Sequence, residues 1–365
     1  MKVKFFILLI IAILFLNELI LVENKYLNPS PMVNNIPIIP EELEPKVLII
    51  GIDGVRGDVA KLSAEREGSG FGQLMENGTW SFNSTVGPIS LSGPSWSSML
   101  TGVWCDRHGV VDNSFEGSKH AEVKNIFEMI EDDQTEYKTA ALYYWSKIGT
   151  EIIGENQADI QERYQTDIEI KNRTIELINN DTELDLLFIS IDNVDSTGHE
   201  YGFSPNITEY VDAVESADDM VAEILLSLNK RNKSGEDWLV IITSDHGGGG
   251  LRPHAHSPST LIDRTTFMLS IGGSSLPGEI SSNPVVVDVA VSTLIHLDIS
   301  LPEETKKLDG RGVLFEDSIP DAREATCIRP ESNYEKKMNL MENIFIISSL
   351  LFITVYVGKI HLKTK

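Results

Sequence analysis

Five short runs of apolar residues recur through the middle of the chain, and they constrain its fold more than any other feature. The runs lie at residues 46–53, 139–145, 184–192, 237–245 and 265–273. Each is about the length of a strand and rich in β-branched and aromatic residues, which is typical of buried β-strands. We therefore expect a sheet whose strands are covered by other elements.

Helical patterns lie among these runs. The strongest covers residues 209–228, where apolar side chains recur at three- and four-residue steps, and another covers residues 287–297. Alternation of strands and helices predicts an α/β fold with a mostly parallel central sheet and helices on both faces. In such folds, active sites lie just beyond the carboxyl ends of the strands.

Aspartate and histidine residues occupy the positions where such a site would form. They are Asp53 after the first run, Asp195 and His199 after the third, and Asp245, His246 and His256 after the fourth. Each alone also fits a turn, a cap or a surface position. A mixture of carboxylate and imidazole suits zinc or a similar transition metal better than calcium or magnesium, which prefer oxygen ligands. Together these residues predict a metal site.

The stretch SLSGPSWSSMLTG at residues 90–102 supplies candidate nucleophiles. Its serines surround a Gly-Pro turn and precede the expected start of a helix. A serine hydroxyl is a weak nucleophile at neutral pH unless a base or a metal ion activates it. By itself the stretch fits either a nucleophile or a serine-rich turn.

An ordered set of motifs between residues 46 and 316 resembles the type I phosphodiesterase/nucleotide pyrophosphatase family of the alkaline phosphatase superfamily. The motifs are DGxR at 53–56, the serine stretch with Thr-Gly at 101–102 and His-Gly at 108–109, D-x-x-x-H-x-x-G at 195–202, S-D-H-G at 244–247 and LDGRGVL at 308–314. Their order is specific, although each motif alone is common. The resemblance implies an alkaline-phosphatase-like three-layer α/β/α sandwich with a mostly parallel central sheet.

The resemblance also implies two divalent metal ions, for which zinc is expected. It assigns their ligands as Asp195, His199 and His256 for one ion, and Asp53, Ser92, Asp245 and His246 for the other. His254 lies two residues before His256 and is expected to stand outside the ligand set.

By the same resemblance, the nucleophile is Ser92, which stands two residues before Pro94 and nine before Thr101. Well-known eukaryotic members have threonine here, so serine is a departure that keeps the hydroxyl. Gly93 and Asn113 are expected to bind the substrate phosphate. The implied reaction is cleavage of a phosphodiester or phosphoanhydride bond, in a nucleotide or lipid substrate, through a phosphoserine intermediate.

Other activities of the superfamily are alternatives. A sulfatase needs Cys or Ser followed by x-P-S-R and a paired Asp at the first strand, but Trp96 and Gly54 occupy those positions. A phosphomonoesterase would favour an arginine that grips two phosphate oxygens; the sequence offers no arginine at a position that indicates this role, and Arg107 and Arg252 stay open. A phosphoethanolamine transferase fits a membrane-tethered chain. A non-catalytic cell-surface domain is least favoured, because the ligand set is intact.

The chain has 365 residues and a formal net charge of −25, which argues against a basic face for nucleic acid. Composition divides it into five parts, with an apolar run after two lysines at one end and an uncharged apolar run near the other. The parts are a signal peptide or N-terminal anchor (1–22), a linker (23–45), the phosphodiesterase catalytic domain (46–316), a stalk (317–340) and a transmembrane helix (341–360).

This organisation predicts a membrane-anchored protein whose catalytic domain lies outside the cell or in the lumen of the secretory pathway. Six Asn-x-Ser/Thr sequons fit that location, at Asn77, Asn83, Asn172, Asn180, Asn206 and Asn232. Cys105 and Cys327 are the two cysteines of the chain, and they could pair in an oxidising compartment. Nothing in the sequence indicates an oligomeric state.

Overall fold

The computed structural model describes residues 43–133, 136–231, 235–257, 259–273, 275, 277–280, 283–301, 308–312 and 326. The chain divides after Leu43, and the folded unit begins at Glu44. Within those ranges, no helix has the length and apolar character needed to span a membrane. The predicted signal or anchor at 1–22 and the transmembrane helix at 341–360 lie outside the described residues, as does almost all of the linker and the stalk.

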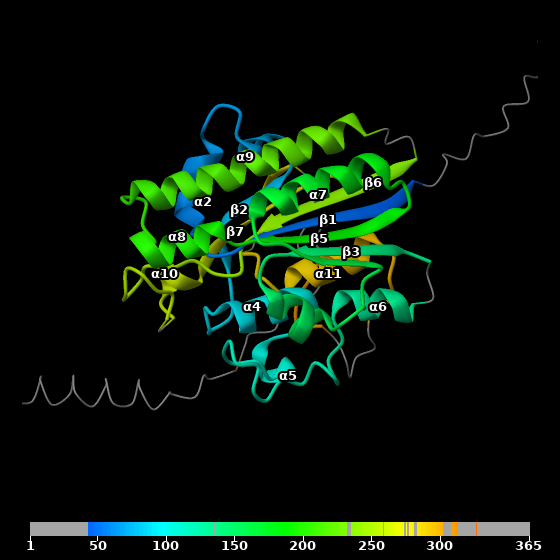
Figure 1. Ribbon diagram of the computed structural model, residues 1–365, viewed down its shortest axis with the longest axis horizontal. Helices are drawn as coiled ribbons and strands as arrows, with labels where there is room; N and C mark the ends of the chain where they lie inside the picture. The colour runs from blue at the N-terminus through cyan, green and yellow to red at the C-terminus, as the bar shows by residue number, and fades with distance from the viewer. Residues whose placement is uncertain are drawn as a thin grey trace, which may run out of the picture. The chain divides into compact units, whose positions relative to one another are not determined.

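Eight strands of the described chain form one sheet (Figure 1). They are β1 (Glu44–Ile52), β2 (Thr79–Thr85), β3 (Lys138–Tyr143), β4 (Ile160–Arg163), β5 (Leu184–Ile191), β6 (Glu236–Thr243), β7 (Thr265–Ile271) and β8 (Gly278–Glu279). Their order is β4-β3-β5-β1-β6-β7-β2-β8. Strand β7 runs antiparallel to β6 and β2, while the other pairs are parallel. The mostly parallel sheet is as predicted.

The central strand β1 is buried on both of its faces. Leu48 and Ile50 point into one hydrophobic core, and Val47 and Ile49 point into a second core on the other side of the sheet. Each such side chain, fully buried, contributes about 1.5–3 kcal/mol. Because successive side chains of a strand alternate between faces, an apolar run like this one needs helices on both sides.

Helices cover both faces of the sheet, as Figure 1 shows. The first core lies under α2 (Gly57–Ala64), α3 (Gly70–Asn77), α7 (Asp167–Asn180) and α9 (Thr208–Lys230). The second lies under α4 (Ser92–Thr101), α6 (Ile126–Asp132) and α11 (Asp288–His296). Shorter elements are α5 (Cys105–His108), the π-helix η1 (Ile148–Ile153), α8 (Asn193–Tyr201) and α10 (Leu261–Arg264). The predicted three-layer α/β/α arrangement is confirmed.

Three parallel strands bring their following segments to the same edge of the sheet. In the register of the sheet, Ile52 of β1 pairs with Ile191 of β5, and Gly51 of β1 pairs with Thr243 of β6. The chain segments that leave these strands therefore start next to one another. They carry all three of the aspartates predicted to bind metal.

Candidate active site

Asp53 and Asp245 lie side by side at the carboxyl ends of β1 and β6. Both are buried, with 3% and 0% of their surfaces exposed. The backbone N–H of Gly54 donates to Asp245 Oδ1 at 3.2 Å, and the indole N–H of Trp96 donates to Asp53 Oδ2 at 3.2 Å. Each carboxylate is thus held by one donor and keeps a second oxygen, Asp53 Oδ1 or Asp245 Oδ2, without a hydrogen-bond partner.

Gly54 makes this close arrangement feasible. Its φ is +74°, in the left-handed region, and a Cβ placed on it would come within 2.7 Å of the Asp195 backbone. A larger residue would be strained and would push the two segments apart. The glycine after Asp53 therefore lets the β1 turn reach α8.

His246 joins the two buried carboxylates to the candidate nucleophile. Its Nε2 lies 3.4 Å from Asp53 Oδ1 and 3.4 Å from Asp245 Oδ2. Ser92 Oγ lies 3.2 Å from the same nitrogen. Four residues that the sequence assigns to one ion therefore meet at one point.

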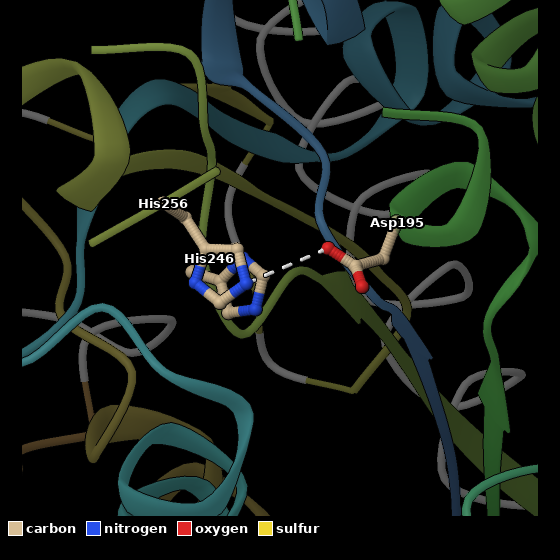
Figure 2. Close-up of side chains that lie close together, drawn as sticks. All are labelled: Asp195, His246 and His256. Atoms are coloured by element: carbon tan, nitrogen blue, oxygen red, sulfur yellow. Dashed lines mark ion pairs between the residues drawn. The ribbon is translucent and has the colours of Figure 1, made fainter. Parts of the chain in front are cut away.

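Asp195 and His199 come from α8, one helical turn apart. His199 Nε2 lies 3.3 Å from Asp195 Oδ2, and His256 Nε2 lies 3.9 Å from Asp195 Oδ1. Figure 2 shows Asp195 facing the His256 ring, which stacks on the ring of His246. The ring centroids are 3.7 Å apart, with the planes inclined by 15°. The residues assigned to the other ion thus adjoin the first group.

His199, His246 and His256 all direct Nε2 toward the site, because Nδ1 of each ring is engaged elsewhere. Their Nδ1 atoms lie 2.8 Å from the carbonyl oxygen of Gly247 for His246, 2.9 Å from that of His254 for His199, and 2.5 Å from that of Ser90 for His256. A carbonyl oxygen only accepts, so each Nδ1 carries the hydrogen. In the neutral ring, Nε2 then holds the lone pair and faces a carboxylate.

The pKa directions agree with this assignment. Burial, together with the neighbouring Asp245, raises the pKa of Asp53 well above its usual value. Burial also lowers the pKa of His246 to about 3, so that ring is neutral. A neutral Nε2 and an ionised carboxylate oxygen are both acceptors, so they face each other favourably only with a cation between them: a proton, as the raised pKa of Asp53 indicates, or a metal ion.

Two groups of side chains fit a metal ion on these grounds. One is Asp53, Asp245 and His246, and the other is Asp195, His246 and His256; within each group, the candidate ligand atoms lie within 4.8 Å of one another. The unpartnered, buried oxygens Asp53 Oδ1, Asp195 Oδ1 and Asp245 Oδ2 belong to these groups. Nitrogen and oxygen donors in this number suit a tetrahedral dication such as zinc.

His199 and His254 occupy different positions from His256. His199 is 45% exposed and adjoins Asp195, whose hydrogen bond raises the pKa of this histidine to about 9. The side chain of His254 is exposed, and only its backbone carbonyl contacts the site, through His199. His256 is 6% exposed. The geometry therefore brings His256 rather than His254 to the carboxylates.

Ser92 is the first residue of α4 and is 8% exposed. The backbone N–H of the next residue, Gly93, donates to Asn113 Oδ1 at 2.7 Å. Lys147 Nζ donates to the Asn113 carbonyl at 2.7 Å and lies 5.2 Å from the centre of the Phe115 ring. Asn113 is thus held next to the nucleophile segment through both its side-chain amide and its backbone carbonyl.

Several residues that hold this site are not evident from the sequence. Trp96 orients Asp53, and the Tyr210 hydroxyl, fully buried on α9, donates to the Gly54 carbonyl at 2.6 Å. Arg56 Nη1 donates to the Phe203 carbonyl at 2.9 Å and so ties the β1 turn to the segment after α8. Arg56 lies in the DGxR motif, but no spacing in the sequence distinguishes Trp96 or Tyr210 from other core aromatics.

The comparisons with known proteins agree with this geometry. The model of the family described as type I phosphodiesterase / nucleotide pyrophosphatase matches residues 47–266. One similar solved structure is murine ectonucleotide pyrophosphatase / phosphodiesterase 5, inactive and in complex with AMP. It has 14% identity and a TM-score of 0.56, and the match covers 71% of this chain and 96% of that one.

Other solved structures with this fold have different activities. A 2-O GAG sulfatase matches with 12% identity and a TM-score of 0.56, over 72% of each chain. A lipoteichoic acid synthase from Listeria monocytogenes matches with 12% identity and a TM-score of 0.54, over 75% of this chain and 76% of that one. At such identities the likeness shows a shared fold, and the chemistry has to be argued from the site.

Proposed function

The chain belongs to the type I phosphodiesterase / nucleotide pyrophosphatase family, and from this we propose that it cleaves phosphodiester or phosphoanhydride bonds with two metal ions and a phosphoserine intermediate. Membership itself indicates a hydrolase of phosphate esters. The complex of the murine relative with AMP supports a nucleotide as the substrate. A lipid phosphodiester is the other substrate class that we propose to test.

One observation carries the proposal. Three buried or nearly buried carboxylates and the Nε2 atoms of two neutral histidines form two groups that share His246, whose Nε2 lies 3.2 Å from the Ser92 Oγ. In a metal-free interior this cluster is electrostatically unfavourable, because like charges and lone pairs face one another. Two dications would offset the charge of the carboxylates and of a deprotonated Ser92.

We assign Asp53, Ser92, Asp245 and His246 to one ion, and Asp195, His199 and His256 to the other, with zinc as the expected metal. When bound, such ions lower the pKa of a hydroxyl or water that they contact and stabilise charge on phosphate oxygens. Ser92 also lies at the amino end of α4, where the helix dipole favours negative charge on Oγ.

Ser92 Oγ, having lost its proton to solvent, attacks phosphorus. The Oγ–P bond forms as the bond from phosphorus to the leaving oxygen breaks. Water then attacks phosphorus, the Oγ–P bond breaks, and the serine hydroxyl is restored as the phosphorylated product leaves. We propose that the Asn113 amide N–H group donates to a non-bridging phosphate oxygen. Since Gly93 N–H donates to Asn113 Oδ1, its role is to orient that amide; its direct contact with substrate stays a prediction.

Trp96 argues against the sulfatase alternative. This residue stands where a sulfatase would have the arginine of its modification motif. It is fully buried and donates to Asp53. The position therefore serves the core and the site rather than modification of Ser92.

We also propose that the catalytic domain lies in an oxidising compartment, anchored to a membrane. Cys105 takes part in a disulfide bond, which is typical of secreted or luminal proteins, whereas Cys327 lies outside the described residues. Five of the six sequon asparagines are described, and all five are exposed: Asn77, Asn83, Asn172, Asn180 and Asn206. Two measurements on a tagged protein would test this location: its recovery in the membrane fraction of the cell, and the loss of mass on treatment with a glycosidase.

A direct test measures the turnover of an aryl phosphodiester, an aryl phosphomonoester and an aryl sulfate by the purified full chain in the presence of zinc. We expect turnover of the phosphodiester to exceed that of the phosphomonoester and of the sulfate. Dominant turnover of the monoester or the sulfate would replace the proposed activity with another of the same superfamily.

A further inference from the structure

We propose that Ser90 and Ser259 are positioning residues that fix the ring of His256, so that one short segment, residues 90–92, holds both ligand groups together. The inference rests on the proposed metal site. It assigns different roles to the two serines of the SLS sequence: Ser92 provides the nucleophile, and Ser90 orients a ligand.

Ser90 and His256 are linked by two hydrogen bonds that run in opposite directions. The Ser90 hydroxyl donates to the His256 carbonyl at 2.5 Å, and His256 Nδ1 donates to the Ser90 carbonyl at 2.5 Å. Ser90 is fully buried, and the two residues are 166 positions apart in the chain. Because the Ser90 carbonyl can only accept, this pair fixes the hydrogen of the imidazole on Nδ1.

Ser259 completes a closed set of hydrogen bonds. Its hydroxyl oxygen accepts from the Ser90 backbone N–H at 2.8 Å and lies 2.8 Å from the Ser90 hydroxyl oxygen. Since the one hydrogen of the Ser90 hydroxyl goes to the His256 carbonyl, the hydrogen between the two hydroxyls comes from Ser259. The Ser90 N–H, the two hydroxyls and the His256 Nδ1–H then each have one acceptor.

This arrangement matters because His256 has no helix or strand of its own to hold it. Residues 254–257 are neither helical nor extended in a sheet, so the orientation of the ring depends on its hydrogen bonds and on stacking. With Nδ1 fixed, Nε2 faces Asp195. Two residues beyond Ser90, Ser92 Oγ contacts His246, whose ring stacks on that of His256. Loss of the Ser90 hydroxyl would therefore disturb His256 directly, whereas the Ser92 group keeps its own contacts with His246.

The test is a titration of the full-length, metal-free protein with Zn²⁺, in competition with a chromophoric chelator. We expect the wild type to bind two ions per chain. Ser90→Ala and Ser259→Ala leave the Ser90 carbonyl that accepts from His256 Nδ1, but they remove the hydroxyls that hold the His256 backbone and the Ser90 N–H. One of the two affinities should therefore fall by about 10-fold, the lower end of the range for residues that orient a metal-binding histidine. The other affinity should stay unchanged, and Ser259→Thr, which keeps the hydroxyl, should bind both ions like the wild type.

Ser97→Ala is the matched control. Ser97 is a fully buried serine of α4 whose hydroxyl has no hydrogen-bond partner, so its removal should leave both affinities unchanged. Folding of each variant is checked by circular dichroism. If the wild type binds two ions but splits no ester, and both serine-to-alanine variants bind one ion more weakly, the proposed function fails and the role of Ser90 stands. If both serine-to-alanine variants fold and bind both ions as tightly as the wild type, the role of Ser90 and Ser259 is overturned.

A second readout needs no metal. In a long-range ¹H–¹⁵N spectrum of the metal-free protein, His256 should be the Nδ1–H tautomer in the wild type. It should become a mixture of tautomers in Ser259→Ala, whose altered residue is only partly buried. An Nε2–H ring in the wild type, or an unchanged ring in the variant, contradicts the proposal even if Ser90→Ala does not fold.

Discussion

The rings of His246 and His256 stack with their centroids 3.7 Å apart. Both histidines are buried, and burial lowers the pKa of each, to about 3 for His246. Two protonated rings at this distance would repel each other strongly in a low-dielectric interior. The stack therefore requires neutral rings, and neutral imidazoles are the form that binds metal ions.

Replacing Ser92 separates chemistry from folding. Ser92→Ala should lower turnover by at least about 10³-fold, because the attacking oxygen is gone, while the Asp195 group and its ion stay in place. Ser92→Thr should keep measurable turnover, since the hydroxyl is retained. Steady-state rates on an aryl phosphodiester, with zinc content measured in parallel, check both expectations. An alanine variant as active as the wild type would exclude Ser92 as the nucleophile.

Asn113 and Lys147 should differ in the size of their effects. Asn113→Ala removes the proposed donor to the phosphate and should lower kcat by on the order of 10²-fold. Lys147→Ala removes the contacts of Lys147 with the Asn113 carbonyl and the Phe115 ring, so a loss of about 10-fold or less is expected. Single-turnover kinetics measure the two. A larger loss in Lys147→Ala than in Asn113→Ala would show that Lys147 itself contacts the substrate.

Metal binding should release protons at pH 7. The hydrogen bond with Asp195 raises the pKa of His199 to about 9, so in the metal-free protein this ring is protonated at pH 7 and must lose its proton to become a ligand. Calorimetric titrations in buffers of different ionisation enthalpy count the released protons. His199→Asn should release about one proton fewer than the wild type; an equal count would mean that His199 is not a ligand.

His108, outside the ligand groups, should make stability fall in acid. Burial lowers its pKa from 6.5 to about 3, so the folded state keeps it neutral while the unfolded state protonates it. Its contribution is present above pH 6.5 and is lost as pH falls toward 3, by on the order of a few kcal/mol. His108→Asn keeps an acceptor for the Val110 N–H, which bonds to His108 Nδ1 in the wild type. Urea denaturation should therefore show a shallower pH dependence for this variant.

The sequence predicts the central layers of the fold well, because buried strands and amphipathic helices leave a clear pattern. All five predicted strands correspond to strands of the sheet, at β1, β3, β5, β6 and β7. The predicted helices at 209–228 and 287–297 correspond to α9 and α11. The first strand begins at Glu44, just inside the segment that we expected to be linker, because its backbone N–H bonds to the Gly235 carbonyl.

Strands at the margins of the sheet are not predicted from the sequence. In β2, polar residues such as Ser81 and Asn83 interrupt the apolar pattern. β4 has only four residues, which are half-buried or exposed, and β8 has two. Their pairing depends on neighbours far along the chain rather than on a local apolar run. The hydrogen bonds of Ser90 with His256 and of Trp96 with Asp53 are long-range in the same way, so the ligand types were predictable but the residues that orient them were not.

The metal site is tested most directly by a crystal structure of the zinc-soaked protein, measured on both sides of the zinc absorption edge. Two anomalous peaks per chain are expected. One should lie against Asp53, Asp245, His246 and the Ser92 oxygen, and the other against Asp195, His199 and His256. A well-ordered site without a peak, or peaks only at other side chains, would contradict this assignment.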